Sequence, residues 1–277
     1  ESLREAVRIL PQDADANLRA RVLEMLARRT MLSGDIQHGI EFSRQAVDAA
    51  ALADSDSVTA NAWITLGTSL AAAGQEDEGL AAYQRVSHLA RSNTRTLLRF
   101  YVNYSDALNH VGRYDDAARQ ALSGVDVARE LGLERSLGAM LAGNAAEPLL
   151  ALGQWARASA MIERALELDP PAHHHAHLRL LQAWLHVWRA QLDEADAVLA
   201  EFRPLITEEQ LAPQYNSQPI RTDAEHALAL GDHQRAWSDV TVFFDHWELY
   251  ERTQCYPLLA VGAAAGRVLD QREGTGE

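Results

Sequence analysis

Lysine is absent from this chain of 277 residues, and cysteine occurs only once, as Cys255. The 25 residues counted as Lys or Arg are therefore all arginine. Without lysine, the chain has no amine for Schiff-base chemistry and no lysine for a phosphate-binding loop. With one cysteine, it forms no internal disulfide and offers no multi-cysteine zinc or iron–sulfur site. These absences exclude several classes of enzyme and of metalloprotein.

Positive charge is also scarce relative to negative charge. The 25 arginines face 39 Asp and Glu residues, which gives a formal net charge of −14. Binding to nucleic acid needs a basic patch that neutralises phosphates, and no window of this sequence supplies one. We therefore expect no direct contact with nucleic acid.

Long uncharged apolar runs are missing as well. The longest, residues 257–266, is about half of the 18 residues that a membrane-spanning helix requires, so we expect no membrane contact. With one thiol and no recognisable export signal, the expected compartment is the cytoplasm. Hydrophobic residues still make up 47% of the chain, enough to build a folded core.

A short motif recurs six times: a small residue, three or four polar residues, and a second small residue five positions after the first. The motifs begin at Gly34, Gly74, Gly112, Gly153, Ala190 and Gly231, which are 40, 38, 41, 37 and 41 residues apart. Each lies between two stretches whose apolar residues recur every three or four positions, as on a helix. Glycine ends helices because it adopts positive φ without a Cβ penalty. The pattern predicts a helix–turn–helix repeat and no sheet.

This repeat resembles the tetratricopeptide (TPR) repeat. Trp63, Leu66, Gly67 and Leu70, with Gly79 and Tyr83 after the turn, match most of its consensus. The resemblance implies an all-α, TPR-like α-solenoid of about six to seven repeats with a period near 40 residues. The expected repeats span residues 18–50, 58–91, 96–130, 137–170, 174–206 and 217–248 of a single domain covering 1–277. Partial repeats are expected at 1–11 and 255–270, which suggests a segment of a longer chain.

A wider resemblance is strongest over residues 95–240. The runs at 101–117, 131–147, 166–171 and 224–232 resemble the TPR-rich region of large ATP-binding LuxR-type bacterial transcriptional regulators. In that family the repeat region receives an inducer or a partner protein, whereas other domains bind nucleotide and DNA. The resemblance therefore implies a non-catalytic sensor and interaction domain. Bacterial cyclases and kinases carry similar repeat regions, so the output domain stays open.

In TPR-like stacks the first helix of each repeat lines the concave face, where a ligand or partner binds. Counting back from the turn residues places polar and aromatic candidates on that face. They are Arg99, Asn103, Asp106, Asn144, Glu147, Trp184, Trp188, Arg221 and Glu225. Glu147 has apolar neighbours and needs a cationic partner, for which Arg99 and Arg221 are the candidates. The alternative is that these side chains form hydrogen bonds between repeats and serve only structure.

Other features give weaker signals. His173 and His177 are one helical turn apart, a spacing that zinc can use, but no suitable third ligand is near, and a solvated helix start is favoured. Pro148 falls inside a first helix, where it removes one backbone hydrogen bond. No nucleophile motif is present, so no catalytic residue and no cofactor is expected. Cys255 is expected to be a small buried hydrophobe.

The expected occupant of the groove is a protein or peptide partner, or a small polar effector. The acidic balance favours a basic or mixed peptide, and the absence of lysine argues against a lysine-based clamp for carboxylate tails. Two further possibilities are a homo-oligomer and a purely structural spacer or oligomerisation scaffold.

Overall fold

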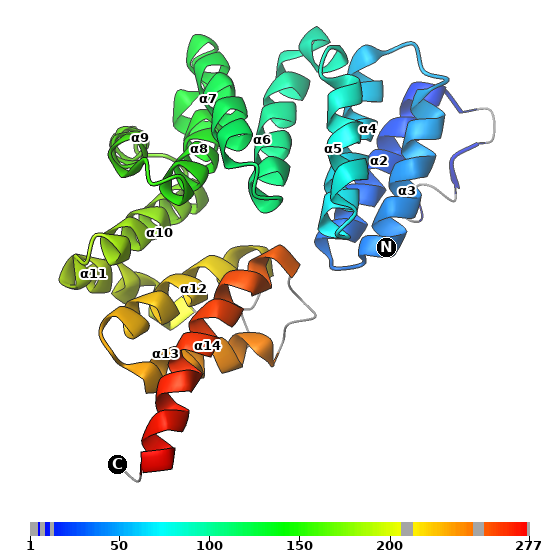
Figure 1. Ribbon diagram of the computed structural model, residues 1–277. Helices are drawn as coiled ribbons and strands as arrows, with labels where there is room; N and C mark the ends of the chain where they lie inside the picture. Colours follow the sequence, from blue (N-terminus) through cyan, green and yellow to red (C-terminus); the bar gives the residue numbers. More distant parts are fainter. Residues whose placement is uncertain (1–4, 6–8, 12–13, 206–212, 246–251, 276–277) are drawn as a thin grey trace. The chain divides into compact units, whose positions relative to one another are not determined.

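The structure is a computed structural model that describes residues 5, 9–11, 14–205, 213–245 and 252–275. Across these residues every regular element is helical, and no strand is present (Figure 1). This confirms the prediction of an all-α fold. Contacts between Cα atoms divide the chain into two compact units, Glu1–Leu133 and Glu134–Glu277.

From residue 14 onward, the N-terminal unit forms three pairs of helices, each joined by a tight turn (Figure 1). They are α2 (Ala16–Leu32) with α3 (Ile36–Ala50), α4 (Asp56–Ala72) with α5 (Glu76–Val86), and α6 (Thr94–His110) with α7 (Tyr114–Glu130). A short 3-10 helix, η1 (Leu89–Ser92), connects the second pair to the third. The first helices α2, α4 and α6 are side by side, because α4 contacts both of the others.

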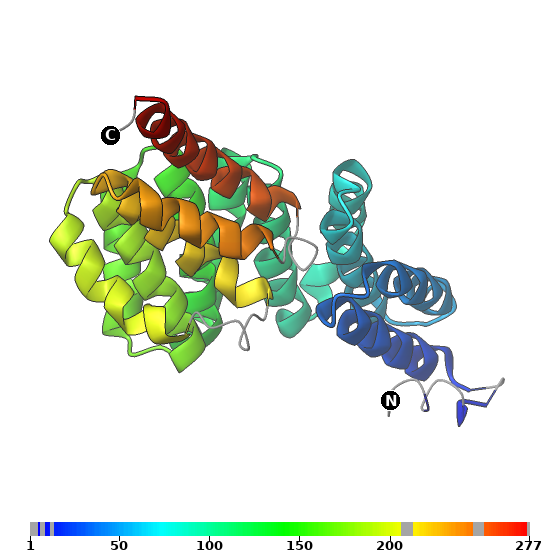
Figure 2. The ribbon, with the colours of Figure 1, turned by 90° about the horizontal axis from the view of Figure 1, so that it is seen from below.

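The C-terminal unit repeats this plan (Figure 2). Its elements are a π-helical turn η2 (Glu134–Gly138), α8 (Ala139–Ala151), α9 (Trp155–Glu167), α10 (Ala172–Trp188), α11 (Leu192–Phe202), η3 (Arg203–Leu205), α12 (Pro213–Ala229), α13 (His233–Phe244) and α14 (Arg252–Thr275). The first helices of its pairs are α8, α10 and α12. Most of the partial repeat expected at 1–11 lies outside the described residues, whereas the one at 255–270 falls within α14.

The six predicted turn residues all have positive φ. The five glycines have φ between 71° and 89°, and Ala190 has φ 57° in the same place. At each turn the following backbone amide reaches back to a carbonyl of the preceding helix, as Gln154 N does to Leu149 O at 2.8 Å and Gln191 N does to His186 O at 2.9 Å. These bonds satisfy carbonyls that a helix end leaves unpaired. The motif therefore marks the turns correctly, including the one without glycine.

Packing within a pair depends on small residues where the helices cross. A Cβ atom on Gly79 would lie 2.9 Å from the carbonyl oxygen of Gly67, and one on Gly67 would lie 2.9 Å from Cε2 of Tyr83. Tyr83 is fully buried against Phe100 and Tyr104, with ring centroids 6.4 and 5.2 Å away. This cluster joins the second helix pair to the third and fixes the position of α6 beside α4.

Candidate functional site

The first helices of the N-terminal unit meet at a central ion pair. Arg99 on α6 lies 3.0 Å from a carboxylate oxygen of Glu24 on α2. Between them, Thr65 on α4 donates to Glu24 at 2.7 Å and accepts from Arg99 at 2.6 Å, and Asn61 accepts from Arg99 at 2.7 Å. One guanidinium therefore links all three first helices.

The charge of Arg99 is already balanced by Glu24, so this side chain holds the first helices in position as well as offering a group for binding. Burial lowers the pKa of the Arg99 guanidinium, Glu24 opposes that shift, and the positive charge of Arg28 adds to it. Asn103 is also engaged. Its amide donates to the carbonyl of Arg99 at 2.8 Å, and its oxygen accepts from Thr68 at 3.4 Å. Asp106 is more exposed and lies 3.6 Å from Nδ1 of His110.

The sequence analysis missed Arg21, Glu24 and Arg28, although a signal for them was present. Arg99, Asn103 and Asp106 precede the turn residue Gly112 by 13, 9 and 6 positions. Counting back from Gly74 by the same 13, 9 and 6 positions gives Asn61, Thr65 and Thr68 of α4. Counting back from Gly34, the three missed residues of α2 lie at 13, 10 and 6, so that Glu24 differs by one position. We call the surface that these nine residues form the first-helix face of the N-terminal unit.

In the C-terminal unit, four of the predicted residues come together. The indole nitrogens of Trp184 and Trp188 on α10 both donate to one oxygen of Glu225 on α12, at 2.7 and 2.9 Å. Nε of Arg221 donates to the other oxygen at 2.8 Å, and its guanidinium carbon stands 4.3 Å from the centre of the Trp184 ring. The two indole rings are 4.5 Å apart.

The cluster leaves some groups free for a ligand. The Trp184 side chain is buried, but Trp188 and Arg221 are half-buried. The terminal guanidinium nitrogens of Arg221 have no hydrogen-bond partner among the described residues, although its Nε is bound. Trp155 on α9, which the sequence analysis did not select, approaches Trp188 with ring centroids 6.3 Å apart. The arrangement is an aromatic surface with one arginine fork beside it.

Asn144 and Glu147 are half-buried on α8, the helix that also contains Pro148. Of the two arginines expected as partners of Glu147, Arg221 forms an ion pair with Glu225 and Arg99 forms one with Glu24 of its own unit. An ion pair forms between side chains that lie close together, on one helix or on neighbouring first helices, and opposite charge alone does not bring two residues together.

The histidine run begins α10. Burial, with smaller contributions from His173 and His177, lowers the pKa of His174 to about 4. The ring of His177 packs on α8, where a Cβ atom on Gly143 would lie 2.5 Å from its Cδ2 atom. Among the described residues, no three His, Cys, Asp or Glu side chains form a group that could hold a metal ion. His177 thus has a packing contact between two first helices.

A charged network, buried only at Asp223 and His226, joins α11, α12 and α13. Nε of Arg203 donates to both oxygens of Asp223 at 3.1 Å, and Nη1 lies 2.8 Å from an oxygen of Asp196. Nε2 of the buried His226 lies 3.0 Å from the Leu192 carbonyl, which can only accept, so Nδ1 accepts from Arg235 at 3.0 Å. This network is structural, since its members hold consecutive helices together.

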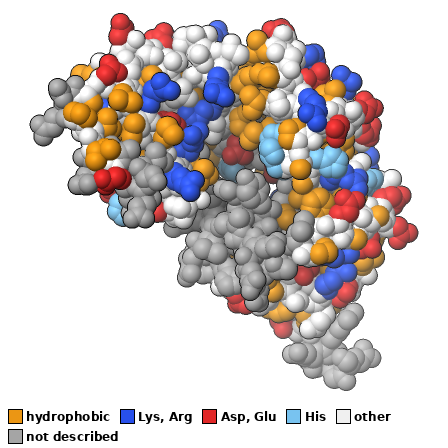
Figure 3. Space-filling model, turned by 180° about the vertical axis from the view of Figure 1, so that it is seen from behind, with side chains coloured by type: hydrophobic (Ala, Val, Ile, Leu, Met, Phe, Trp, Pro, Cys, Tyr) orange, Lys and Arg blue, Asp and Glu red, His pale blue; other side chains and the backbone are white. Residues whose placement is uncertain are grey.

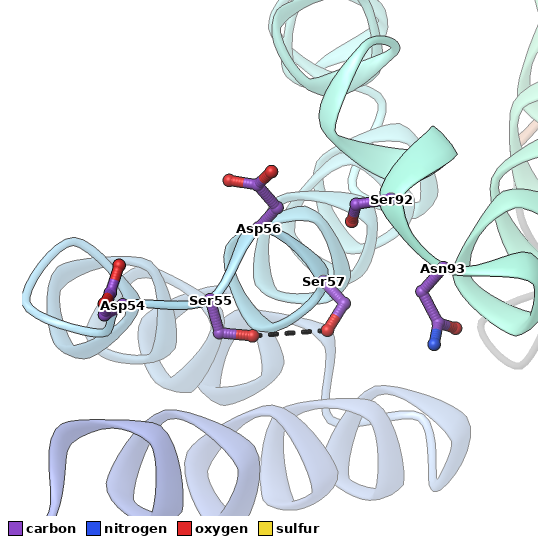
Figure 4. A pocket seen from close by; sticks show the side chains of 6 residues that line it. All are labelled: Asp54, Ser55, Asp56, Ser57, Ser92 and Asn93. Carbon is purple, nitrogen blue, oxygen red and sulfur yellow. Dashed lines mark hydrogen bonds between the residues drawn. The ribbon is translucent and has the colours of Figure 1, made fainter.

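A hollow of about 360 Å³ lies at the starts of α4 and α6 (Figure 4). Its lining residues are Asp54, Ser55, Asp56, Ser57, Ser92 and Asn93. Ser55 and Asn93 accept hydrogen bonds from the backbone amides of Val58 and Thr96, and so cap their own helices. The hollow is open and its polar groups are those that helix starts require, so it is not our candidate site.

Comparisons with known proteins support the fold and leave the function open. No protein-family model matches the sequence, and no curated protein matches it as a relative. Several solved structures are similar. The apo form of RapI aligns over 98% of this chain and 81% of its own, with a TM-score of 0.64 and 13% identity. Aspartyl phosphate phosphatase F from Bacillus subtilis aligns over 90% and 72%, with a TM-score of 0.60 and 12% identity.

A tetratricopeptide repeat protein from Parabacteroides merdae aligns over 93% of both chains, with a TM-score of 0.55 and 16% identity. At such identities the likeness concerns the fold alone. The fold of this chain is thus TPR-like. No helix of the described residues has the length and apolarity to cross a membrane.

Proposed function

We propose that this chain is a non-catalytic interaction and sensor domain that binds a partner protein or an effector on the first-helix faces of its repeats. One observation carries the proposal. In each unit, charged or aromatic side chains of neighbouring first helices converge, and some of their hydrogen-bonding groups have no partner in the described part of the chain. The unused guanidinium nitrogens of Arg221 beside Trp188 are the example in the C-terminal unit.

A structural scaffold is the second candidate, and Glu225 is the observation that favours it. Both oxygens of its carboxylate are used by neighbouring side chains of the same unit. Such a network holds α10 and α12 at a fixed distance even when nothing binds. The two candidates differ in whether the first-helix faces contact another molecule in the cell.

Photo-crosslinking in the cells that make the protein separates them. A photoreactive phenylalanine analogue replaces Arg28 on α2 or Glu147 on α8, both on first helices. In the matched controls it replaces Arg44 on α3 or Glu163 on α9, which are exposed on second helices. We expect discrete adducts of higher mass from the first-helix positions only. Adducts from the second-helix positions alone, or from none of the four, would overturn the proposal.

We further propose that the domain belongs to a LuxR-type transcriptional regulator of the cytoplasm. The residue runs at 131–147 and 224–232 support this assignment, because they resemble that family's repeat region. The complete gene tests it. We expect a phosphate-binding loop encoded upstream and a helix–turn–helix encoded downstream, and a cyclase or kinase domain in their place would refute it.

A further inference from the structure

Four arginines gather at the first-helix face of the N-terminal unit: three belong to it, and Arg95 stands beside it, one helical turn before Arg99. Arg21 and Arg28 stand on α2, and Arg95 and Arg99 stand on α6. We call these four residues the arginine strip. On a helix with 3.6 residues per turn, positions four and seven apart lie within about 40° of one another. Each pair therefore points to one side of its helix.

The two halves of the strip are held close together. The ion pair between Glu24 and Arg99 joins α2 to α6 at 3.0 Å. Arg28 is one turn beyond Glu24 on α2, and its charge is close enough to lower the pKa of Arg99, adding to the larger effect of burial. Between them, α4 presents only neutral side chains on this face, Asn61, Thr65 and Thr68.

Three of the four guanidiniums are available to a partner. Arg21, Arg28 and Arg95 are exposed, and within the described part of the chain none of them forms an ion pair or a side-chain hydrogen bond. Arg99, by contrast, is held in place by its ion pair with Glu24, at the centre of the strip. Figure 3, which shows the side opposite to Figure 1, has a run of arginine side chains at its upper left, over the N-terminal unit.

The charge of this face is opposite in sign to the net charge of the chain. The face, together with Arg95 beside it, has four arginines against two carboxylates, Glu24 and Asp106, and Asp106 is 3.6 Å from His110. The whole chain has a net charge of −14. A locally positive surface on an acidic protein attracts an anionic segment, whereas the acidic remainder of the protein repels it.

We propose that the arginine strip binds an acidic peptide segment of a partner protein, in an extended conformation across α2, α4 and α6. The proposal rests on the proposed function and names the class of partner for the N-terminal unit. Three neighbouring helices with axes about 8–10 Å apart span roughly 20 Å, which about six extended residues cover. Arginine suits carboxylates because its planar fork donates two parallel hydrogen bonds.

A peptide fits this surface better than a nucleic acid does. The positive charge is confined to one face of three helices, and the acidic remainder of the chain repels a long polyanion. Among the described residues of this face, no exposed aromatic ring is available to stack on bases, since Tyr83, Phe100 and Tyr104 are buried.

Fluorescence anisotropy with the full chain tests the proposal. The probe is a labelled hexaglutamate peptide, measured at about 50 mM salt, where surface charges are weakly screened. In the test variant, R21Q, R28Q and R95Q are combined. The control combines R44Q, R85Q and R91Q, which removes three exposed arginines of the same unit that lie outside the strip. Both variants change the net charge equally, and thermal unfolding checks that both remain folded.

We expect saturable binding of the probe, a loss of at least tenfold in affinity for the test variant, and less than a twofold change for the control. Affinity should also fall severalfold at about 300 mM salt. Equal losses in both variants, or no binding, would overturn the acidic-peptide proposal. So would a twelve-residue oligothymidylate that binds more tightly than the peptide. If the crosslinks on first helices persist in any of these cases, the general proposal of partner binding stands while this one fails.

Discussion

At the scale of single residues, Ala190 is the exception among the six turns, because it has positive φ without being glycine. A left-handed conformation costs a residue with a Cβ atom about 1–2 kcal/mol, and glycine avoids that cost while losing about 0.5–1 kcal/mol of chain entropy. We predict that Ala190→Gly stabilises the chain by about 0.5–1 kcal/mol, measured by urea denaturation.

The reverse substitution provides the control. Gly153 has φ 71° in the preceding turn, and a Cβ atom there would meet no atom within 4 Å. Gly153→Ala should therefore destabilise the chain through its backbone alone, by about 1 kcal/mol. If both substitutions shift stability in the same direction, the strain assigned to Ala190 is wrong.

Asp239 is a second residue whose surroundings in the folded chain lower its stability. Burial raises its pKa to about 6, the Asp223 carboxylate adds to the shift, and Arg235 and Arg203 oppose it. Its Oδ2 atom is buried without a hydrogen-bond partner among the described residues. Because the folded pKa exceeds the ordinary value of 3.8, the folded chain holds the proton more tightly than the unfolded chain. The contribution of Asp239 to stability therefore falls as the pH rises from about 4 to 6.

We predict that Asp239→Asn raises the melting temperature at about pH 8, where the wild-type carboxylate is charged, and that the gain shrinks at about pH 5. Thermal unfolding at the two pH values measures this. Asp48→Asn, at an exposed position on α3, is the control and should show little change at either pH. A gain for Asp239→Asn that does not depend on pH would contradict the prediction.

At the scale of helix pairs, the close approach of α4 and α5 depends on Gly79. A Cβ atom at Gly79 would lie 2.9 Å from the Gly67 carbonyl oxygen and 3.1 Å from the backbone nitrogen of Ala71. Backbone atoms cannot move aside cheaply, so overpacking costs about 1–3 kcal/mol, while alanine gains about 1 kcal/mol in helix propensity. The difference is about 0–2 kcal/mol, and we predict that Gly79→Ala lowers the free energy of unfolding by about 1 kcal/mol.

Glu78→Ala is the matched control, because its side chain is exposed one position earlier on the same helix. Urea denaturation of both variants should show a loss for Gly79→Ala and little change for Glu78→Ala. Equal stability of the two variants would show that the helices separate without cost.

Helices and turns were predictable because their causes are local. The period of the apolar residues gives the helices, and a small residue in the left-handed region gives each turn, as at Gly34 and Ala190. The candidate site was predictable in part. Trp184 and Glu225 meet because both lie six residues before their turns on neighbouring first helices, and Trp188 and Arg221 join them because each is one helical turn away on the same helix. The ion pair of Arg221 with Glu225, in place of the Glu147 that we expected, was not predictable, since charge alone does not tell which side chains are within reach.

At the scale of the whole molecule, the net charge and the local charge of one face predict different classes of partner. The composition favours a basic or mixed peptide, because acidic residues outnumber arginines. The arginine strip, however, combines residues from helices more than 60 positions apart, and no window of the sequence shows it. The acidic remainder of the chain still disfavours nucleic acid, so the expectation of no nucleic-acid contact stands beside the acidic-peptide proposal.

The sequence by itself determined the all-helical repeat, its turns and the residue types on each first helix, because helix periodicity and turn geometry depend on neighbours along the chain. Only the tertiary structure decided which of these side chains are already paired. Arg99 and Glu225 are held by contacts between helices, while Arg21, Arg28 and Arg95 remain exposed. The physical reason is that an ion pair forms over a few ångströms in space, a distance that separation along the chain does not measure.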